Sequence, residues 1–392
     1  MPGALAGIRV VEFAQYMQGP WCGQLLGDMG ADVIKVEPPG RGDGGRVPGV
    51  LGEDDDSTFF LAMNRNKRSV TLDLKHDGGA EAARELIVTA DVVIENFRPG
   101  TMDRLGLGYE SMSELNPDLV FASATGWGSS GPLVRLPGHD LPAQARSGAM
   151  SVGGSAGQPP TPSGLFVADG IGSMLLAFAV VVALQARQQT GRGQRVETSL
   201  LNALIHMQTL ELTTYMNTGV PPRRGPAGGH VYMEGPYGTY RAADGYLVLG
   251  PMPIVELAEV LDLPQVPERF ADKRQLWRER EALYALIAPV IERMPVDHWL
   301  GEFEQRGIAC GPVNDYDAVI ADPQVAANSM LTEIEDPARG RLRVTGIPIR
   351  FSDTAAEIRM PPPRLGAHTD EVLAELGFNE EAIEQLRVSG AL

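Results

Sequence analysis

Hydrophobic runs of two lengths alternate along the first third of the chain. Short runs rich in valine and isoleucine predict strands, and longer runs with helical spacing between them predict helices. The first unit is a strand over 8–13, a helix over 21–29 that ends at Gly30, and a strand over 31–36. The same rules predict a strand over 69–74, a helix over 79–89 and strands over 91–97 and 119–124. Strands that alternate with helices indicate an α/β fold with a doubly wound, Rossmann-like parallel sheet.

Long apolar helices are expected in the middle of the chain. They cover 170–189 and 200–217, on either side of a short strand over 194–197. The composition then changes, because residues 219–229 contain three prolines and four glycines, which is typical of a linker. We therefore expect a large domain over 1–218, joined by this linker to the rest of the chain.

A smaller α/β domain is expected over 230–319. It begins with a hairpin pattern around Asp244-Gly245 and continues with helical segments from 254 to about 306. From about 320 to 392 the chain is polar and irregular until two final helices, over 369–376 and 380–387.

The charge of the chain limits its partners. It has 392 residues, and 33 basic against 50 acidic side chains give a net charge of −17. An acidic protein binds nucleic acids and anionic membrane surfaces poorly, so neither is an expected partner. Any anionic ligand has to meet a local group of basic residues.

The expected location is the cytoplasm. Cys22 and Cys310 are the only cysteines, which is no basis for a disulfide framework and fits a reducing compartment. We see no secretory signal pattern at the start of the chain. The longest apolar run, over 174–184, is too short to span a bilayer.

A basic cluster stands out against this acidic background. It comprises Arg65, Lys67, Arg68 and Lys75, with Asp73 as the one acid among them. Arg98 and Arg104 come later, at the end of a predicted strand, where parallel sheets bind ligands. Two interpretations stay open, namely a site for a polyanion such as a nucleotide phosphate, or a solvated face with ordinary ion pairs.

Three residues, at two places in the chain, are candidates for catalysis. His139 and Asp140 lie in a loop after a predicted strand, where they form either a general acid–base pair or an ordinary turn. Asp169 lies just before an apolar helix, where it is either an N-cap or a desolvated carboxylate able to attack an activated acyl group.

Other motifs carry weaker signals. The glycines at 19, 23, 27 and 30 do not match a dinucleotide-binding loop and favour close helix packing. The six histidines show no metal-ligand spacing, so no metal site is expected. Neither cysteine has an obvious histidine partner for a thiol nucleophile.

Nine short segments, spread from the start of the chain to its end, resemble the family III coenzyme A transferases. They are 7–12 (GIRVVE), 30–37 (GADVIKVE), 66–69 (NKRS), 91–100 (DVVIENFRPG), 104–106 (RLG), 137–140 (PGHD), 190–194 (TGRGQ), 310–313 (CGPV) and 365–370 (LGAHTD). The resemblance implies a Rossmann-like large domain, a small domain, a C-terminal return over 320–392 to the large domain, and an interlocked homodimer.

The resemblance also implies roles for individual residues. Asp169 looks like the nucleophile, and His139 and Asp140 look like the pair at the thioester end of the pocket. The residues implied to bind coenzyme A are Gln18, Leu72, Asp73, Leu74, Lys75, Asn96, Phe97, Arg98, Arg104, Pro137 and Gly138. Backbone N–H groups at Gly170 and at Gln18-Gly19 are candidate oxyanion donors.

The implied reaction moves coenzyme A from an acyl-CoA to a carboxylic acid through an aspartyl-CoA intermediate, with no cofactor other than coenzyme A itself as a substrate. An α-methylacyl-CoA racemase is the alternative within the family, with His139 and Asp169 exchanging the α-proton. A coenzyme A-binding protein without catalysis is the third hypothesis.

Overall fold

The chain divides into two compact units in the computed structural model, which describes residues 2–47 and 57–392. The first unit comprises 1–143, 166–204 and 323–392, and the second comprises 144–165 and 205–322. The chain therefore enters the second unit at 144 and again at 205, and the segment 219–229, expected to be a linker, lies inside that unit. The segment 144–165, expected in the large domain, also belongs to the second unit.

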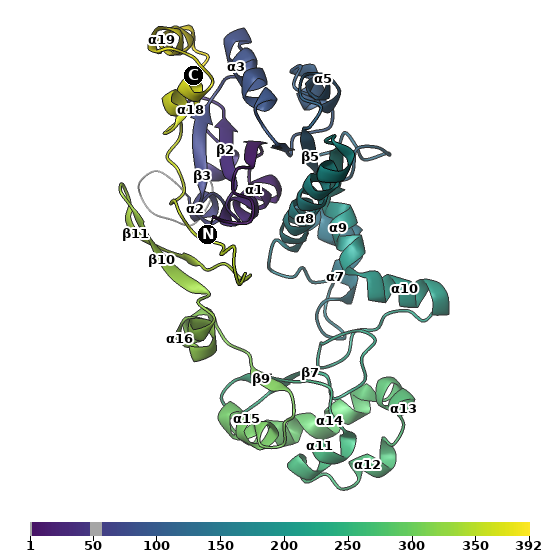
Figure 1. The fold of residues 1–392 in the computed structure, drawn as a ribbon. Helices are drawn as coiled ribbons and strands as arrows, with labels where there is room; N and C mark the ends of the chain where they lie inside the picture. The colour runs from purple at the N-terminus through teal and green to yellow at the C-terminus, as the bar shows by residue number, and fades with distance from the viewer. Residues whose placement is uncertain (1, 48–56) are drawn as a thin grey trace. The chain divides into compact units, whose positions relative to one another are not determined.

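A six-stranded sheet forms the centre of the first unit (Figure 1). Its strands are β1 (Arg9–Phe13), β2 (Asp32–Glu37), β3 (Lys67–Thr71), β4 (Val92–Glu95), β5 (Val120–Thr125) and β6 (Arg195–Ser199). Every adjacent pair is parallel, and the order is β3-β2-β1-β4-β5-β6. This order confirms the α/β prediction. It reverses direction between β1 and β4, where doubly wound sheets bind their ligands.

Helices cover both faces of this sheet (Figure 1). One face packs against α3 (Asp77–Val88), α5 (Tyr109–Leu115), α18 (Thr369–Glu375) and α19 (Glu380–Ser389). The other face packs against α1 (Gln18–Asp28) and α8 (Val167–Thr190). Along β1, Val11 and Phe13 point to the first layer and Val10 points to the second, as the two-residue period of a strand requires.

Glycines allow α1 to pack closely against its neighbours. A Cβ at Gly19 would overlap the side chain of Ala14, and one at Gly27 would lie 3.1 Å from the Asn66 backbone oxygen. On α8, a Cβ at Gly172 would meet the side-chain amide of Gln18 at 2.5 Å. The packing interpretation of these glycines is therefore confirmed.

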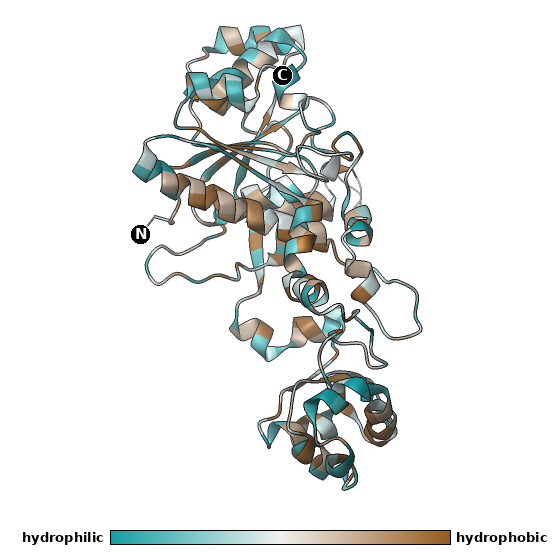
Figure 2. Cartoon of the chain, turned by 90° about the vertical axis from the view of Figure 1, so that its right-hand side faces the viewer, coloured by the Kyte–Doolittle hydropathy of each residue, from teal (hydrophilic) through white to brown (hydrophobic). Residues whose placement is uncertain are grey.

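Helix α8 confirms the long helix predicted over 170–189 and extends slightly beyond it at both ends. It has 24 residues, and by length and composition alone it is apolar enough to cross a membrane. The expectation from the sequence concerned the apolar run 174–184 alone, and the helix continues beyond that run at both ends. Figure 2 shows hydrophobic residues along this helix where it crosses the sheet. A buried core helix has the same composition, and α8 packs on α1 and on β5.

Several elements differ from the sequence prediction. The helix expected over 200–217 is two helices, α9 (Leu200–Met207) and α10 (Thr209–Thr218). The region expected to be irregular contains a hairpin of β10 (Leu331–Asp336) and β11 (Gly340–Thr345). Its strands alternate exposed charged residues with partly buried ones, so they lack the continuous apolar run by which the core strands were predicted.

The second unit has a small antiparallel sheet and a helical core. Its strands are β7 (Gly238–Arg241), β8 (Tyr246–Leu249) and β9 (Cys310–Pro312), paired in that order. Its helices are α11 (Ile254–Leu261), α12 (Val266–Arg269), α13 (Lys273–Arg278), α14 (Arg280–Ile291) and α15 (Val296–Glu304). The hairpin around Asp244-Gly245 is confirmed, whereas the three-residue β9 is too short to leave a pattern.

Short elements connect these larger ones. They are η1 (Gly44–Arg46), α2 (Thr58–Met63), α4 (Thr101–Arg104), α6 (Asp140–Arg146), α7 (Ala149–Val152), α16 (Tyr316–Ala321) and α17 (Pro323–Ala327).

Candidate active site

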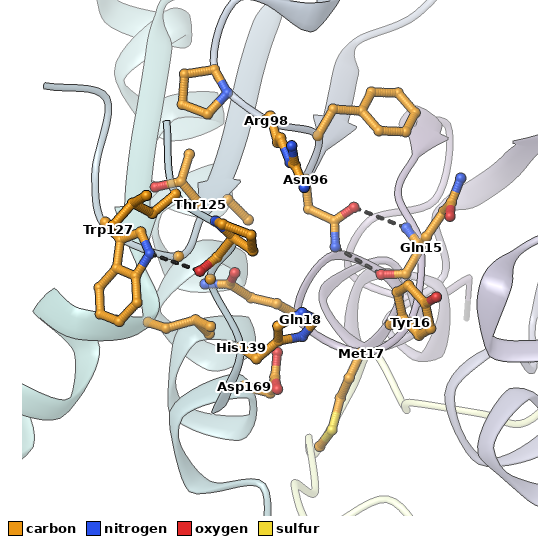
Figure 3. A pocket seen from close by; sticks show the side chains of 18 of the residues that line it. Gln15, Tyr16, Met17, Gln18, Asn96, Arg98, Thr125, Trp127, His139 and Asp169 are labelled. Carbon is orange, nitrogen blue, oxygen red and sulfur yellow. Dashed lines mark hydrogen bonds between the residues drawn. The ribbon is translucent and has the colours of Figure 1, made fainter. Parts of the chain in front are cut away.

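A cavity of about 620 Å³ opens at the carboxyl ends of β1, β4 and β5 (Figure 3). Its lining comes from the segments directly after these strands, from the loop before α6 and from the start of α8. The lining residues are Gln15, Tyr16, Met17, Gln18, Arg41, Asn96, Phe97, Arg98, Pro99, Ala124, Thr125, Gly126, Trp127, Gly128, Val134, Leu136, Pro137, Gly138, His139, Asp169 and Leu200. The position is the one that the reversal of strand order predicts.

Two hydrogen bonds fasten the segment after β1 to the segment after β4. The N–H of Gln15 donates to Asn96 Oδ1 at 2.9 Å, and Asn96 Nδ2 donates to the Gln15 carbonyl at 2.7 Å. The N–H of Phe97 donates to Glu95 Oε2 at 2.9 Å, and burial raises the pKa of Glu95 to about 7. Both lining segments are thus held where the strand order reverses, between β1 and β4.

Two glycines bring the loop before α6 against the end of β5. A Cβ at either Gly126 or Gly138 would overlap the backbone of the other. Trp127 Nε1 also donates to the Pro137 carbonyl at 3.1 Å. These contacts set His139, the next residue along, at the edge of the cavity.

The start of α8 is capped by Asp140 and not by Asp169. Asp140 Oδ2 accepts from the N–H of Ala168 at 2.7 Å and from the N–H of Asp169 at 3.1 Å. Negative charge is favourable at a helix N-terminus, so this buried carboxylate is well satisfied. Asp140, expected beside the thioester, is not among the lining residues and instead supports the helix that carries Asp169.

The Asp169 side chain lies on the cavity wall (Figure 3). Among residues 2–47 and 57–392, none donates a hydrogen bond to its carboxylate. Burial, together with the nearby charge of Asp140, raises the pKa of Asp169 to about 7. The N-cap interpretation of Asp169 is therefore wrong, and the carboxylate is available for chemistry near neutral pH.

Gln18 lies beside Asp169 and has an unused donor. Its side chain is 4% exposed, and Nε2 has no hydrogen-bond partner within the part of the chain that the structure describes. It stands at the first position of α1, a helix end without a side-chain cap. Partial positive charge at that end favours an anion in the cavity. Ser173 Oγ fixes this arrangement by donating to the carbonyls of Gln18 and Asp169.

The structure corrects one proposed oxyanion donor. The N–H of Gly170 donates to the Phe166 carbonyl at 2.9 Å inside the first turn of α8. It is therefore occupied, and the expectation that it stabilises an oxyanion was wrong.

The remaining predicted binding residues fall into two groups. Asn96, Phe97, Arg98, Pro137 and Gly138 line the cavity. Five others do not: Leu72, Asp73, Leu74, Lys75 and Arg104. Leu72 is buried in the core, and the N–H of Asp73 donates to the Ala391 carbonyl. Arg104 is exposed and donates to Thr101 Oγ1 at 2.9 Å.

Three members of the basic cluster serve the interior of the first unit. Arg65 pairs with Asp28 at 2.8 Å, Lys67 with Glu12 at 2.8 Å, and Arg68 with Asp32 at 2.6 Å. The phosphate interpretation is wrong for these three, and so is the solvated-face interpretation, because all three are buried.

The cations that do line the cavity are Arg98 and Arg41. Sequence reasoning missed Arg41, although its place shortly after a predicted strand was a usable signal. It also missed Gln15, Tyr16, Met17 and Trp127, which come after predicted strands in the same way. Within the described residues, no group of three or more His, Cys, Asp and Glu side chains is arranged to hold a metal ion.

Comparison with known proteins identifies the family of the chain. The family described as CoA-transferase family III matches residues 5–369. An acyl-CoA transferase of Fusarium pseudograminearum is 36% identical, over all of this chain and 88% of its own length. Succinyl-CoA:glutarate CoA-transferase of Homo sapiens is 32% identical, over 99% of this chain and 90% of its own length.

Among solved structures, a CAIB/BAIF family protein from Brucella suis superposes with a TM-score of 0.85 at 34% identity. The match covers 96% of this chain and all of that one. The relatives are named as transferases, which does not favour the racemase hypothesis. The chain belongs to family III of the CoA-transferases, enzymes that act on acyl-CoA and carboxylate substrates.

Proposed function

We propose that this CoA-transferase works through a covalent aspartyl-CoA thioester on Asp169. One observation carries the proposal: the Asp169 carboxylate faces the cavity and has no hydrogen-bond donor among the described residues, while Asp140 caps the helix in its place. A carboxylate that is poorly solvated and poorly hydrogen-bonded is a stronger nucleophile than one in water.

The first half-reaction loads the enzyme. An Asp169 oxygen attacks the thioester carbonyl, the C–S bond breaks, and a mixed anhydride and the CoA thiolate form. The thiolate then attacks the Asp169 carbonyl carbon of the anhydride. The donor leaves as a free carboxylate, and the aspartyl-CoA thioester remains.

The second half-reaction runs the same steps in the opposite direction. An acceptor carboxylate attacks the aspartyl thioester, which gives a new mixed anhydride and the thiolate. The thiolate attacks the acceptor's acyl carbon, which releases the new acyl-CoA and restores the Asp169 carboxylate. Neither half-reaction consumes water. The free energy of the thioester is conserved only if water is kept from both the anhydride and the aspartyl thioester.

Gln18 and His139 flank this chemistry. Each tetrahedral intermediate carries an oxyanion, and the unused donor beside Asp169 is Gln18 Nε2. This atom is enclosed against Gly172 in the structure, so we assign it to the oxyanion after a rotation of the Gln18 side chain toward the cavity. The N-terminus of α1 adds favourable electrostatics for the same charge. His139 lines the same cavity, and we assign it to orient the acyl group.

Arg98 and Arg41 are the cavity's groups for the phosphates of coenzyme A, because guanidinium groups bind phosphate oxygens in pairs. The segment over 72–75 and Arg104 lie off the cavity lining, so they would reach only the distal, adenosine end of the ligand. Coenzyme A acts as a substrate here, and no further cofactor is part of the proposal.

The proposed acceptor is a small carboxylic acid. Relatives are named for glutarate, mesaconate and oxalate, which are all dicarboxylic acids. A panel of these acids with succinyl-CoA or acetyl-CoA as donor, combined with mass spectrometry of the CoA products, identifies the pair that this chain uses.

We also propose that the chain acts in the cytoplasm as an interlocked homodimer. Met174, Phe178 and Val182 recur every four residues on α8 and are about half exposed or more. An apolar stripe of this kind is unfavourable in water and is suited to a second copy of the chain. Light scattering of the purified protein at micromolar concentration should give twice the chain mass of 42.0 kDa.

The covalent intermediate has a direct test. The enzyme is incubated with acyl-CoA, treated with hydroxylamine, digested and analysed by mass spectrometry. A hydroxamate at Asp169 is expected, because hydroxylamine attacks an aspartyl thioester. Absence of the adduct in an enzyme that turns over would refute the intermediate. Rapid α-deuteration of a 2-methylacyl-CoA in D₂O, without an acceptor acid, would instead support the racemase.

A further inference from the structure

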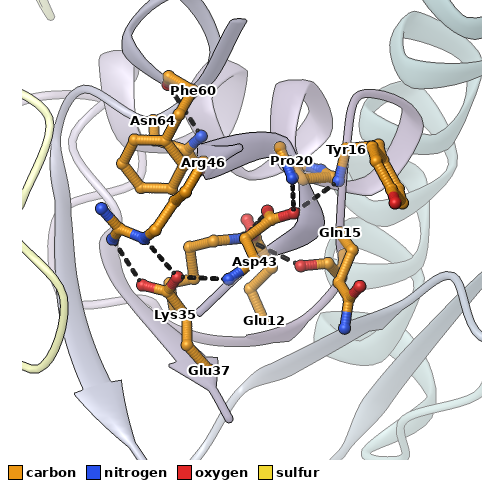
Figure 4. A network of polar contacts seen from close by, with 12 residues as sticks. Glu12, Gln15, Tyr16, Pro20, Lys35, Glu37, Asp43, Arg46, Phe60 and Asn64 are labelled. Atoms are coloured by element: carbon orange, nitrogen blue, oxygen red, sulfur yellow. Dashed lines mark hydrogen bonds and ion pairs between the residues drawn. The ribbon is translucent and has the colours of Figure 1, made fainter. Parts of the chain in front are cut away.

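Four buried charges lie against the loop that joins β1 to α1, and Figure 4 labels three of them, Glu12, Lys35 and Asp43. They are Glu12, Lys35, Asp43 and Lys67, whose side chains are at most 1% exposed; we name them the charge cluster. None of the four lines the cavity. Two acids balance two bases, but buried ion pairs contribute little net stability compared with apolar side chains of similar size. The location of the cluster therefore needs another explanation.

Lys35 holds the beginning of the loop. Its Nζ lies 2.8 Å from Glu12 Oε1, 2.8 Å from Asp43 Oδ2 and 2.8 Å from the Ala14 carbonyl. Two of its N–H bonds donate to Glu12 Oε1 and to the Ala14 carbonyl, and the contact with Asp43 Oδ2 is an ion pair. Burial alone would lower the pKa of Lys35, but the carboxylates around it outweigh this effect and raise it.

Lys67 holds the end of the loop in a similar way. Its Nζ lies 2.8 Å from Glu12 Oε2, 2.8 Å from Asn64 Oδ1 and 2.7 Å from the carbonyl of Pro20 in the first turn of α1. A Cβ at Gly23 would overlap the Glu12 carboxylate, so the helix leaves space for this pair. Two ammonium groups from β2 and β3 thus hold the backbone on both sides of the loop.

Asp43 holds the middle of the loop. Its Oδ1 accepts from the N–H of Tyr16 at 2.9 Å and from the N–H of Gly45 at 2.7 Å. Tyr16 has a φ of 64°, a left-handed conformation that is unfavourable for a tyrosine. Such a backbone persists only where its surroundings impose it, and Tyr16 and Gln18 both line the cavity beside Asp169.

We propose that Asp43 and Lys35 are positioning residues, which force Tyr16 into its left-handed conformation and thereby set the Gln18 side chain against the reacting centre. This inference rests on the proposed function, because it assigns Gln18 to the oxyanion. Displacement of a catalytic donor by about 1 Å costs on the order of a hundredfold in rate, so the cluster affects turnover without touching substrate.

The test compares Asp43→Asn with Asp28→Asn. Asp28 is equally buried, is paired with Arg65 and accepts from Asn66, but it lies at the opposite end of α1 and off the cavity. Both variants should lose stability in thermal denaturation. Only Asp43→Asn should lower kcat, by about tenfold to a hundredfold, while KM for acyl-CoA changes less than about threefold.

Hydrogen exchange without substrate provides a readout independent of activity. In Asp43→Asn, the amides of 14–18 should exchange at least about tenfold faster, with those of 24–28 unchanged. Asp28→Asn should give the reverse pattern. Equal exchange of 14–18 in wild type and Asp43→Asn would overturn the positioning role. An unchanged kcat with faster exchange would overturn the link to catalysis, while a wild-type enzyme that transfers no CoA would overturn the proposed function instead.

A second variant serves if Asp43→Asn does not fold. The double variant Lys35→Met/Asp43→Asn removes one charge of each sign, so Glu12 and Lys67 remain as a neutral pair. Replacing a buried ion pair by uncharged groups is often tolerated. The double variant should fold and show the same loss of kcat, and a wild-type kcat in it would refute the proposal.

Discussion

Two aspartates lie close together at the start of α8, and they differ in their hydrogen bonds and in their contact with the cavity. Asp140 is buried and accepts two backbone N–H bonds from the first turn. Asp169, on that turn, receives no hydrogen bond among the described residues and faces the cavity. The comparison shows how one carboxylate satisfies the helix end and thereby leaves the other free. It also explains the raised pKa of Asp169, because burial and the nearby Asp140 charge act together.

The largest expected effect comes from removing the free carboxylate. Asp169→Asn keeps the shape of the side chain but cannot attack a thioester, so kcat should fall by about a thousandfold or more. Binding of CoA, measured by calorimetry, should change little, because the phosphate-binding cations are untouched. Turnover is measured with succinyl-CoA and the best acid of the panel. Activity within about tenfold of wild type would exclude Asp169 as the nucleophile.

The second effect concerns the unused donor beside that carboxylate. Gln18→Ala should lower kcat by about a hundredfold with KM nearly unchanged, since the lost hydrogen bond forms mainly in the transition state. Gln24→Ala is a matched control, because Gln24 is also on α1 and is 3% exposed, but it accepts from the backbone of Arg65. Equal losses of kcat in the two variants would assign Gln18 a structural role only.

How much of this arrangement was predictable from sequence depends on the range of the contacts involved. The core strands were predictable from local hydrophobic periodicity, which is why the parallel sheet was expected. The placement of β3 was not, because Arg68 lies within it and finds Glu371 and Glu375 about 300 residues away. From the sequence alone, a charged residue inside a strand suggests that the strand has ended, because its ion-pair partner is not visible in the local pattern.

The same limit applies to the site. Spacing alone left Asp169 between an N-cap and a nucleophile, and the resemblance to the transferases favoured the nucleophile. The structure removes the N-cap interpretation, because the cap comes from Asp140, which lies on α6, 29 residues before Asp169. Gln18 was expected as a binding residue through the resemblance, but its vacant donor depends on how α1 packs against Gly172.

The third effect tests the capping aspartate. Asp140→Asn keeps one acceptor but loses the charge at the helix end, so unfolding free energy should fall by about 1 kcal/mol and kcat by about tenfold. The wild-type kcat/KM should rise with pH through about 7, as Asp169 ionises. Removing the Asp140 charge lowers the pKa of Asp169, so this rise should move to lower pH. A rise that stays in place would show that Asp140 does not influence Asp169.

The smallest expected effect is a gain in stability when the free carboxylate is neutralised. Folding raises the pKa of Asp169 from 3.8 to about 7, so the folded protein binds a proton that the unfolded chain releases between these values. The resulting destabilisation is absent below pH 3.8, grows as the pH rises, and is complete above pH 7. The asparagine in Asp169→Asn cannot ionise, so this variant lacks the pH-dependent destabilisation. Because part of the side chain contacts solvent, the gain should be about 1 kcal/mol near pH 8 and should vanish near pH 4.

Urea denaturation at the two pH values measures this difference, with Asp140→Asn as the control that loses stability at the higher pH. If Asp169→Asn were also less stable there, its carboxylate would be as well satisfied as that of Asp140, and the contrast between the two aspartates would be lost.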